Sequence, residues 1–153
     1  MIVYRMAKST CSSDLSGKGA EKTGGRWNSK GIAVIYTSES RALCTTEIAV
    51  HIPLGILPKD FQLVSIDIPT SVKILSLSAR DLPSNWDAIP HAGETQELGD
   101  QFVRQNKQAV LKVPSAVVRG EYNYLINPGH KEAKKIRIKK VEQFSFDQRL
   151  FLK

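Results

Sequence analysis

The feature that most constrains this chain is a long polar stretch, residues 8–31, between two short apolar segments, residues 2–5 and 32–36. Ordered loops of this length are uncommon inside a compact domain, and they are usually functional or disordered. Glycine lets a backbone approach a ligand closely, and basic side chains attract anions. The stretch contains both kinds of residue, namely Gly17, Gly19, Gly24, Gly25 and Gly31 with Lys18, Lys22, Arg26 and Lys30.

The composition fits one globular domain over residues 1–153, because 41% of the residues are hydrophobic and 24% are charged. A net charge of +7 favours anionic partners, but it does not choose between a nucleic acid, a nucleotide and an acidic protein. No apolar run approaches the roughly 20 residues of a membrane span, and the N-terminus does not resemble a signal peptide. We therefore expect a cytoplasmic protein without a membrane partner. Cys11 and Cys44 lack metal-ligand spacing, so we expect neither a disulfide framework nor a metal site.

Hydrophobic patterning predicts several strands and two principal helices. The helices are expected at residues 39–51 and 94–107, the first capped by Thr37 or Ser38 with Glu39 in its first turn, the second weakened by Gly99. This order is not a regular alternation of strand and helix, so we predict an α+β fold with mainly antiparallel sheets. The strands are expected at residues 2–5, 32–36, 61–68, 72–77, 109–113, 122–126, 135–141 and 143–146.

Glu47 is the sharpest local anomaly in the sequence. On the expected helix it shares a face with Leu43 and Val50, which places a carboxylate on a stripe that should face the core. A buried carboxylate is costly unless it is paired. One interpretation puts Glu47 at the edge of this stripe, beside a lysine. The other places a catalytic carboxylate beneath the glycine-rich basic loop.

A second candidate site feature is the segment Gly24-Gly25-Arg26-Trp27-Asn28. Arg26 offers a planar set of donors that suits phosphate or ribose oxygens, although the segment is also compatible with an ordinary surface turn. Tyr36 follows at the end of an apolar strand. Its ring could face a flat heterocycle, or it could be a core tyrosine with its hydroxyl hydrogen-bonded.

Ser115 follows a proline in an apolar setting and needs a partner if it is buried. No GxSxG motif surrounds it, so nothing marks it as an activated nucleophile. We assign no role to His51, His91 or His130, which lack metal-ligand spacing. Basic residues between positions 131 and 140 alternate with apolar ones, which indicates a solvated strand face or, alternatively, a docking surface for an acidic partner.

Taken together, these segments resemble the RES domain family. The resemblance extends over nearly the whole chain, and it is specific because the motifs occur jointly and in order. They are Gly24-Gly25-Arg26-Trp27-Asn28, Gly31, Tyr36-Thr37-Ser38-Glu39-Ser40, Ala42, Glu47, Leu82-Pro83, Trp86, Thr95-Gln96, Gly99-Asp100, Val113-Pro114-Ser115, Glu121, Asn123-Tyr124-Leu125, Asn127-Pro128, His130, Phe146-Asp147 and Arg149-Leu150.

The resemblance implies a fold similar to that of ADP-ribosyltransferases and a bacterial toxin that cleaves the nicotinamide–ribose bond of NAD⁺, by hydrolysis or phosphorolysis, and so arrests growth. It assigns the catalytic arginine, glutamate and serine to Arg26, Glu47 and Ser115. Tyr36 is the associated aromatic residue. The expected NAD⁺ contacts are Arg26, Tyr36, Ser115 and the loop residues Gly25, Trp27 and Asn28.

The resemblance also implies an Xre-like antitoxin that covers the site between Arg26 and Glu47, and self-association of the toxin. NAD⁺ would be the substrate, with no further cofactor, and nucleic acid would be met only through the antitoxin. Two other functions stay open. One is a toxin that transfers ADP-ribose to a protein, and the other is a basic nucleic-acid-binding module or ribonuclease toxin.

One carboxylate suffices for the predicted reaction. The nicotinamide ring is cationic in NAD⁺ and leaves as a neutral molecule, so it needs no general acid, unlike the leaving group of an ordinary glycosidase substrate. We expect Glu47 to hydrogen-bond the ribose hydroxyls and to stabilise the positive charge that develops on the ribose. Tyr36 would stack on nicotinamide, Arg26 would hold ribose or phosphate oxygens, and Ser115 would orient Glu47 or the ribose.

Overall fold

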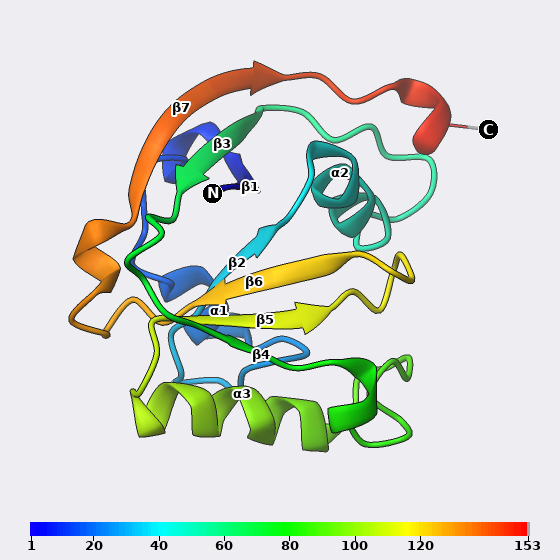
Figure 1. The fold of residues 1–153 in the computed structure, drawn as a ribbon. Coiled ribbons are helices and arrows are strands. Elements are labelled where there is room, and N and C mark those ends of the chain that lie inside the picture. Colours follow the sequence, from blue (N-terminus) through cyan, green and yellow to red (C-terminus); the bar gives the residue numbers. More distant parts are fainter. Residues whose placement is uncertain (153) are drawn as a thin grey trace.

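A computed structural model describes residues 1–152, in which seven strands form one sheet in the order β4-β5-β6-β2-β1-β3-β7 (Figure 1). Every neighbouring pair is antiparallel except β4 and β5, which are parallel. The predicted α+β class with a mainly antiparallel sheet is therefore confirmed. The strands are β1 (Ile2–Lys8), β2 (Ile35–Ser38), β3 (Phe61–Asp67), β4 (Ile74–Ser76), β5 (Val110–Pro114), β6 (Tyr122–Ile126) and β7 (Arg137–Phe144).

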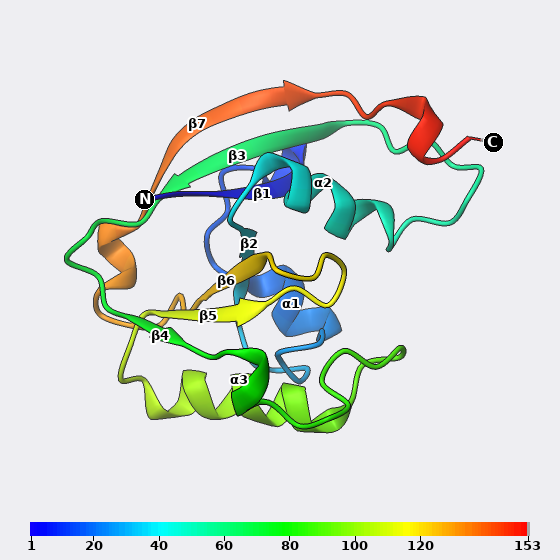
Figure 2. The same cartoon turned by 45° about the vertical axis from the view of Figure 1, so that its right-hand side comes forward.

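The helices lie against different parts of this sheet (Figures 1 and 2). Helix α3 (Gly93–Gln105) runs along the end that contains β4 and β5, whereas α2 (Arg41–Ala49) lies beside β1 and β2. No helix within the described part of the chain has the length and apolar composition to cross a membrane. The shorter elements are α1 (Lys18–Thr23) and the 3₁₀ turns η1 (Ser9–Cys11), η2 (Ala79–Asp81), η3 (Ala133–Lys135) and η4 (Gln148–Leu150).

Several predicted boundaries were wrong. The polar stretch contains α1 and η1, and the strand expected at residues 32–36 begins only at Ile35. Helix α2 is capped by Ser40, whose side chain accepts from the amide of Leu43 at 3.0 Å. Glu39 precedes this helix and accepts from the amide of Tyr122 at 2.7 Å, so tertiary contact with β6 competes successfully with the helix dipole.

The sheet is nearly divided between β1 and β2. These two strands share a single register pair, Tyr4 with Ser38, whereas β1 pairs with β3 over all seven of its residues. Figures 1 and 2 show the β1–β3–β7 half and the β2–β6–β5–β4 half diverging from this junction. The division brings β1, β2 and α2 together around one cavity.

Each half of the sheet contributes its own apolar cluster. Trp27 and Phe102 pack with residues of β5 and β6 on the α3 side. On the α2 side, Phe146 lies edge-on to the rings of Phe61, Phe144 and Phe151, with ring centroids 5.0–5.5 Å apart. Both walls of the cavity therefore rest on packed cores.

Strand β7 replaces the two strands expected at residues 135–141 and 143–146. Its register against β3 shifts between Ser65 and Ile66, because Ser65 faces Lys140 and Ile66 faces Ile138. The extra residue, Lys139, forms a bulge. As a result Lys139 and Lys140 are both exposed, so the basic face is present but the alternation that indicated it is interrupted.

Candidate active site

A cavity of about 910 Å³ lies where β1, β2, α1 and α2 approach one another. Arg26 and Glu47, which the sequence singled out separately, both line it. Gly25, Trp27 and Tyr36 line it as well, whereas Ser115 and Asn28 lie behind its wall. The fold thus joins the glycine-rich loop and the carboxylate helix in one site.

Glu47 is half-buried and is held by neutral donors. Its Oε1 accepts from Ser115 Oγ at 2.9 Å and from Asn123 Nδ2 at 2.7 Å. No ion pair among residues 1–152 includes Glu47, so the lysine-paired interpretation does not hold. Both bonds end on one oxygen, which leaves Oε2 without a hydrogen-bond donor in the described chain. The arrangement fixes a negative charge without neutralising it.

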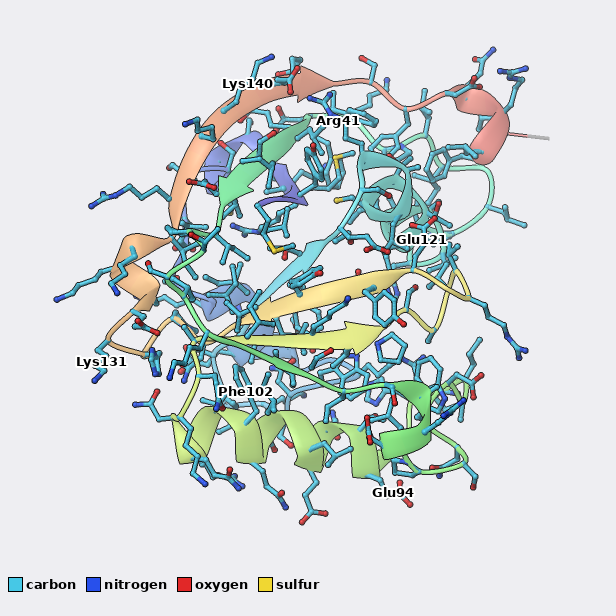
Figure 3. The ribbon with its side chains drawn as sticks, viewed as in Figure 1. Arg41, Glu94, Phe102, Glu121, Lys131 and Lys140 are labelled. Carbon is cyan, nitrogen blue, oxygen red and sulfur yellow. The ribbon has the colours of Figure 1, made fainter. Side chains whose placement is uncertain are left out.

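The helix that presents Glu47 is anchored at its start. Ser40 caps the first turn of α2 and its hydroxyl donates to Glu121 Oε2 at 3.2 Å. Figure 3 shows Glu121 between α2 and the beginning of β6. The anchor sets the direction of α2, and Glu47 then projects toward the residues that follow β5 and begin β6.

Ser115 has every hydrogen-bonding direction occupied. Its hydroxyl donates to Glu47 and accepts from the amides of Val117 and Val118, both at 3.0 Å. The side chain is only 1% exposed. A hydroxyl with one proton and two lone pairs can do no more. These contacts place Ser115 where it can orient Glu47, which is one of the two roles suggested for it.

Asn123 also holds Glu47, and sequence reasoning gave it no role of its own. Its Oδ1 accepts from Ser38 Oγ at 2.8 Å, which directs its Nδ2 toward Glu47. Ser38 and Asn123 are direct cross-strand partners in the β2–β6 pair. Asparagine is depleted in strands, so its presence between Tyr122 and Tyr124 was the available signal.

Arg26 is half-buried at the opposite wall of the cavity. Its Nη1 donates to the carbonyl oxygens of Trp86 at 2.8 Å and Ala88 at 3.0 Å. A guanidinium has five N–H donors, so the three on Nε and Nη2 are left for a ligand. The side chain is held in place while keeping its fork of donors, which an ordinary surface turn would not require.

Tyr36 combines the two interpretations that the sequence left open. Its hydroxyl donates to Asn28 Oδ1 at 2.6 Å and accepts from the amide of Trp27 at 3.1 Å, while its ring lines the cavity. Burial is the main cause that raises the pKa of Tyr36, so the phenol stays neutral. A Cβ atom on Gly25 would lie 2.7 Å from the Tyr36 hydroxyl. Position 25 is therefore a glycine because the Tyr36 side chain packs directly against the backbone there.

Asn28 and Trp27 support the loop more than they face the cavity. Asn28 is completely buried, and its Nδ2 donates to the carbonyls of Ala20 at 2.8 Å and Ile32 at 2.9 Å. We predicted a contact between Asn28 and NAD⁺, but the side-chain amide of Asn28 already makes its hydrogen bonds within the loop and to Tyr36. Trp27 is 3% exposed and packs in the α3 cluster.

Helix α3 holds the same loop from outside. Gln96 donates to the carbonyl of Gly25 at 3.0 Å, and Asp100 accepts from the amide of Ser29 at 2.8 Å. A Cβ atom on Gly99 would lie only 1.7 Å from the carbonyl oxygen of Trp27. The glycine that should weaken this helix is therefore required for the loop to pack on it.

Four further residues in the cavity carry charge or can carry it, and the sequence had not selected them: Arg5, Asp14, His51 and His91. Arg5 donates to the carbonyl of Asp14, and burial lowers the pKa of its guanidinium. An arginine stays charged in proteins, so Arg5 adds a cation to Arg26 and Lys18 in this cavity. The signal for Arg5 was a basic residue within the first apolar strand.

Comparison with known proteins assigns the chain to a family. The RES domain model matches residues 2–147. A "Prs ADP-ribosylating toxin" of Sphingobium sp. (strain YBL2) is 42% identical over 92% of this chain and 88% of its own length. A "Toxin Res" of Yersinia enterocolitica is 37% identical over 98% of this chain and 99% of its own.

A solved structure supports the fold. The crystal structure of the M. tuberculosis MbcT–MbcA toxin–antitoxin complex matches with a TM-score of 0.74 and 20% identity, covering 98% of this chain and 86% of the other. Together with the family match, this confirms the resemblance noted from the sequence motifs. The chain belongs to the RES domain family, the family of the Res toxins.

Proposed function

We propose that this protein is the toxin of a toxin–antitoxin pair and that it cleaves the nicotinamide–ribose bond of NAD⁺. The observation that carries the proposal is the Glu47 carboxylate, fixed by two neutral donors and facing a cavity that also holds Arg26 and Arg5. An unneutralised carboxylate suits a developing cation, and guanidinium groups suit a pyrophosphate.

In the proposed step, the C–N bond between ribose and nicotinamide breaks and its electron pair goes to the departing ring. Nicotinamide leaves neutral, and positive charge develops at C1″ and the ring oxygen of the ribose that carried it. Glu47 stabilises this charge and accepts hydrogen bonds from the ribose hydroxyls. Such preorganised groups are each worth about 3–4 kcal/mol of transition-state stabilisation. The acceptor, such as water or phosphate, then bonds to C1″ through an oxygen and gives up a proton to solvent.

The other residues hold the substrate. The three free donors of Arg26 bind ribose or phosphate oxygens, and the Tyr36 ring offers a neutral stacking face for nicotinamide. Ser115 and Asn123 act through Glu47 by fixing its orientation. Gly25 and Trp27 shape the wall beside Arg26.

Water or inorganic phosphate as acceptor would deplete NAD⁺ and arrest growth. A second candidate function is transfer of ADP-ribose to a protein, which is favoured by the name of the Sphingobium relative, an "ADP-ribosylating toxin". Both candidates use the same bond cleavage and differ only in the acceptor.

Mass spectrometry of NAD⁺ incubated with the purified protein separates these candidates. Free ADP-ribose indicates hydrolysis, and ADP-ribose-1″-phosphate that appears only with added phosphate indicates phosphorolysis. A mass increase on a protein target indicates protein modification. Intact NAD⁺ in all these reactions, together with RNA binding that falls steeply with salt, would overturn the proposal in favour of a nucleic-acid-binding protein.

We further propose an antitoxin that covers the mouth of the Glu47 cavity. The structural neighbour is a toxin in a complex with its antitoxin, and the exposed lysines of β7 offer a basic surface for an acidic partner. Self-association of the toxin stays a prediction. The cytoplasmic location and the absence of a cofactor other than the substrate NAD⁺ stay predictions as well. Protection of NAD⁺ by the co-expressed antitoxin would test the partner.

A further inference from the structure

A second cavity, of about 410 Å³, lies at the other end of the β2–β6 pair. It shares only Ile35 with the Glu47 cavity and contains none of the residues assigned to NAD⁺ cleavage. Its floor is apolar, and it includes Leu15, Ile126 and Ile136. Its polar residues are His130, Lys131 and Lys134. The proposed reaction therefore gives no reason for this cavity.

His130 is the buried polar group of the second cavity, with an exposed fraction of 6%. Its Nδ1 accepts from the amide of Glu132 at 3.1 Å, so the neutral ring carries its proton on Nε2. Nε2 donates to no acceptor within residues 1–152. Every polar side-chain atom there that is fully shut off from solvent has a hydrogen-bond partner, so Nε2, which has none, must be reached by solvent. The Nε2–H therefore opens onto the cavity as a free donor.

The turn that carries His130 is built from inside the protein. Asn127 is buried and its Nδ2 donates to Asn106 Oδ1 at 2.9 Å, while its Oδ1 accepts from the amide of Gly129 at 3.0 Å. The amide of His130 also donates to the carbonyl of Asn127 at 3.2 Å. The imidazole is thus held in one position before any ligand arrives.

The charged side chains that line this cavity are all positive. Lys131 and Lys134 line it and are exposed, and Figure 3 shows Lys131 at the outer edge of the molecule. Neither lysine takes part in an ion pair among residues 1–152. Glu132 is bound instead to Lys135 at 3.0 Å, and no carboxylate lines the cavity. A fixed N–H donor and two unpaired cations suit an anionic group, and the apolar floor suits an apolar group attached to that anion.

We propose that this cavity, the His130 site, binds a phosphate monoester whose organic group packs on the apolar floor. The phosphate accepts from His130 Nε2 and pairs with Lys131 and Lys134. A dianion suits two unpaired lysines, because charge-assisted hydrogen bonds are the stronger kind. The site is independent of NAD⁺ cleavage, so its test needs no NAD⁺.

Calorimetric titration of the full chain with phenyl phosphate tests the His130 site. Inorganic phosphate supplies the phosphate group alone and phenol the organic group alone, and we expect phenyl phosphate to bind about tenfold more tightly than either. Absence of saturable binding by phenyl phosphate, or binding no tighter than that of inorganic phosphate, would overturn the proposal.

Matched variants locate the binding. Lys134→Glu should weaken phenyl phosphate binding about tenfold or more, whereas Lys139→Glu, with the same charge change outside the cavity, should stay within about twofold. Equal weakening by both variants would indicate diffuse attraction to a basic protein, which contradicts a site. Because phenyl phosphate could also enter the Glu47 cavity, Arg26→Lys is a third variant, and weaker binding there would likewise contradict the proposal.

His130→Phe removes the buried donor and keeps a planar ring. We expect this variant to lose most of the difference in affinity between phenyl phosphate and phenol, with folding checked by thermal unfolding. The two lysine variants lie at exposed positions and keep the test decisive if the phenylalanine variant fails to fold. Unchanged affinity in a folded His130→Phe protein would remove His130 from the site.

Discussion

Two carboxylates, Glu47 in the cavity and Glu142 on the surface, are both held by two donors but in opposite ways. Glu142 meets two cations, Lys140 at 3.0 Å and Arg41 at 2.7 Å. Glu47 meets a hydroxyl and a carboxamide. The cations around Glu142 cancel its charge, with Lys140 the first cause that lowers its pKa. The neutral donors also hold the Glu47 side chain in one orientation, but they bring no positive charge to cancel that of a carboxylate.

The comparison predicts its largest effect for Glu47→Gln. The amide keeps the size of the side chain and an oxygen that can accept from Ser115 and Asn123, but it removes the charge. We expect kcat for NAD⁺ cleavage to fall about 10²- to 10³-fold, the usual effect of losing one electrostatic stabiliser. Product formation followed by mass spectrometry measures this change.

Glu142→Gln is the matched control, because it makes the same chemical change at the carboxylate paired with cations. Its kcat should equal that of the unmodified protein. A folded Glu47→Gln protein with full activity would show that the charge of Glu47 contributes no more to NAD⁺ cleavage than the charge of Glu142 does.

The next effect concerns the neutral donors themselves. Ser115→Ala removes one donor to Glu47 and leaves the amides of Val117 and Val118 without their acceptor. We expect the free energy of unfolding to fall by about 1–3 kcal/mol, as for buried groups that lose a partner. The kcat should fall about tenfold with little change in KM, because Ser115 acts only through the orientation of Glu47.

Asn123→Ala should show the same split between kcat and KM, since it removes the other donor. A rise in KM at constant kcat in both variants would mean that these residues bind substrate directly. Urea unfolding of each variant separates lost activity from lost structure.

A smaller effect is expected from Arg26→Lys. Lysine keeps the charge but loses the planar fork that binds two carbonyls and still offers three donors. We expect KM for NAD⁺ to rise about tenfold, which corresponds to one good hydrogen bond to a charged group. Arg41→Lys, the same change beside Glu142, should leave KM unaltered, and a similar rise there would point to a general charge effect.

The smallest effect is on stability against acid. The pKa of Glu142 is lowered in the folded protein, so its contribution to stability is present above the ordinary glutamate range and is lost as pH falls through the lowered pKa. Thermal unfolding of Glu142→Gln should therefore differ slightly from the unmodified protein at neutral pH and not at all in strong acid. A difference that grows toward acid would contradict the assigned sign.

The sequence predicted the parts of the site that depend on local chemistry. A carboxylate on an apolar helix face and two glycines before an arginine were visible because each breaks a simple pattern. The roles of Asn123 and Gly99 were not predicted, because each depends on a contact with a distant part of the chain. Asn123 contacts Glu47, and Gly99 packs on the carbonyl of Trp27. A strand asparagine and a helix glycine look only unfavourable until their partners are known.

By itself, the sequence determined the fold class, the helix that carries Glu47, the special character of the Gly24–Gly25–Arg26 loop and the basic face near the C-terminus. Hydrophobic periodicity and glycine placement are local, and they survive any arrangement of the elements. Only the tertiary structure decided that β1 and β2 meet at one pair, that this brings Arg26, Arg5 and Glu47 around one cavity, and that the uncharged side chains of Ser115 and Asn123 hold Glu47. Those facts depend on strand order and on contacts between residues up to 76 positions apart, which no local pattern encodes.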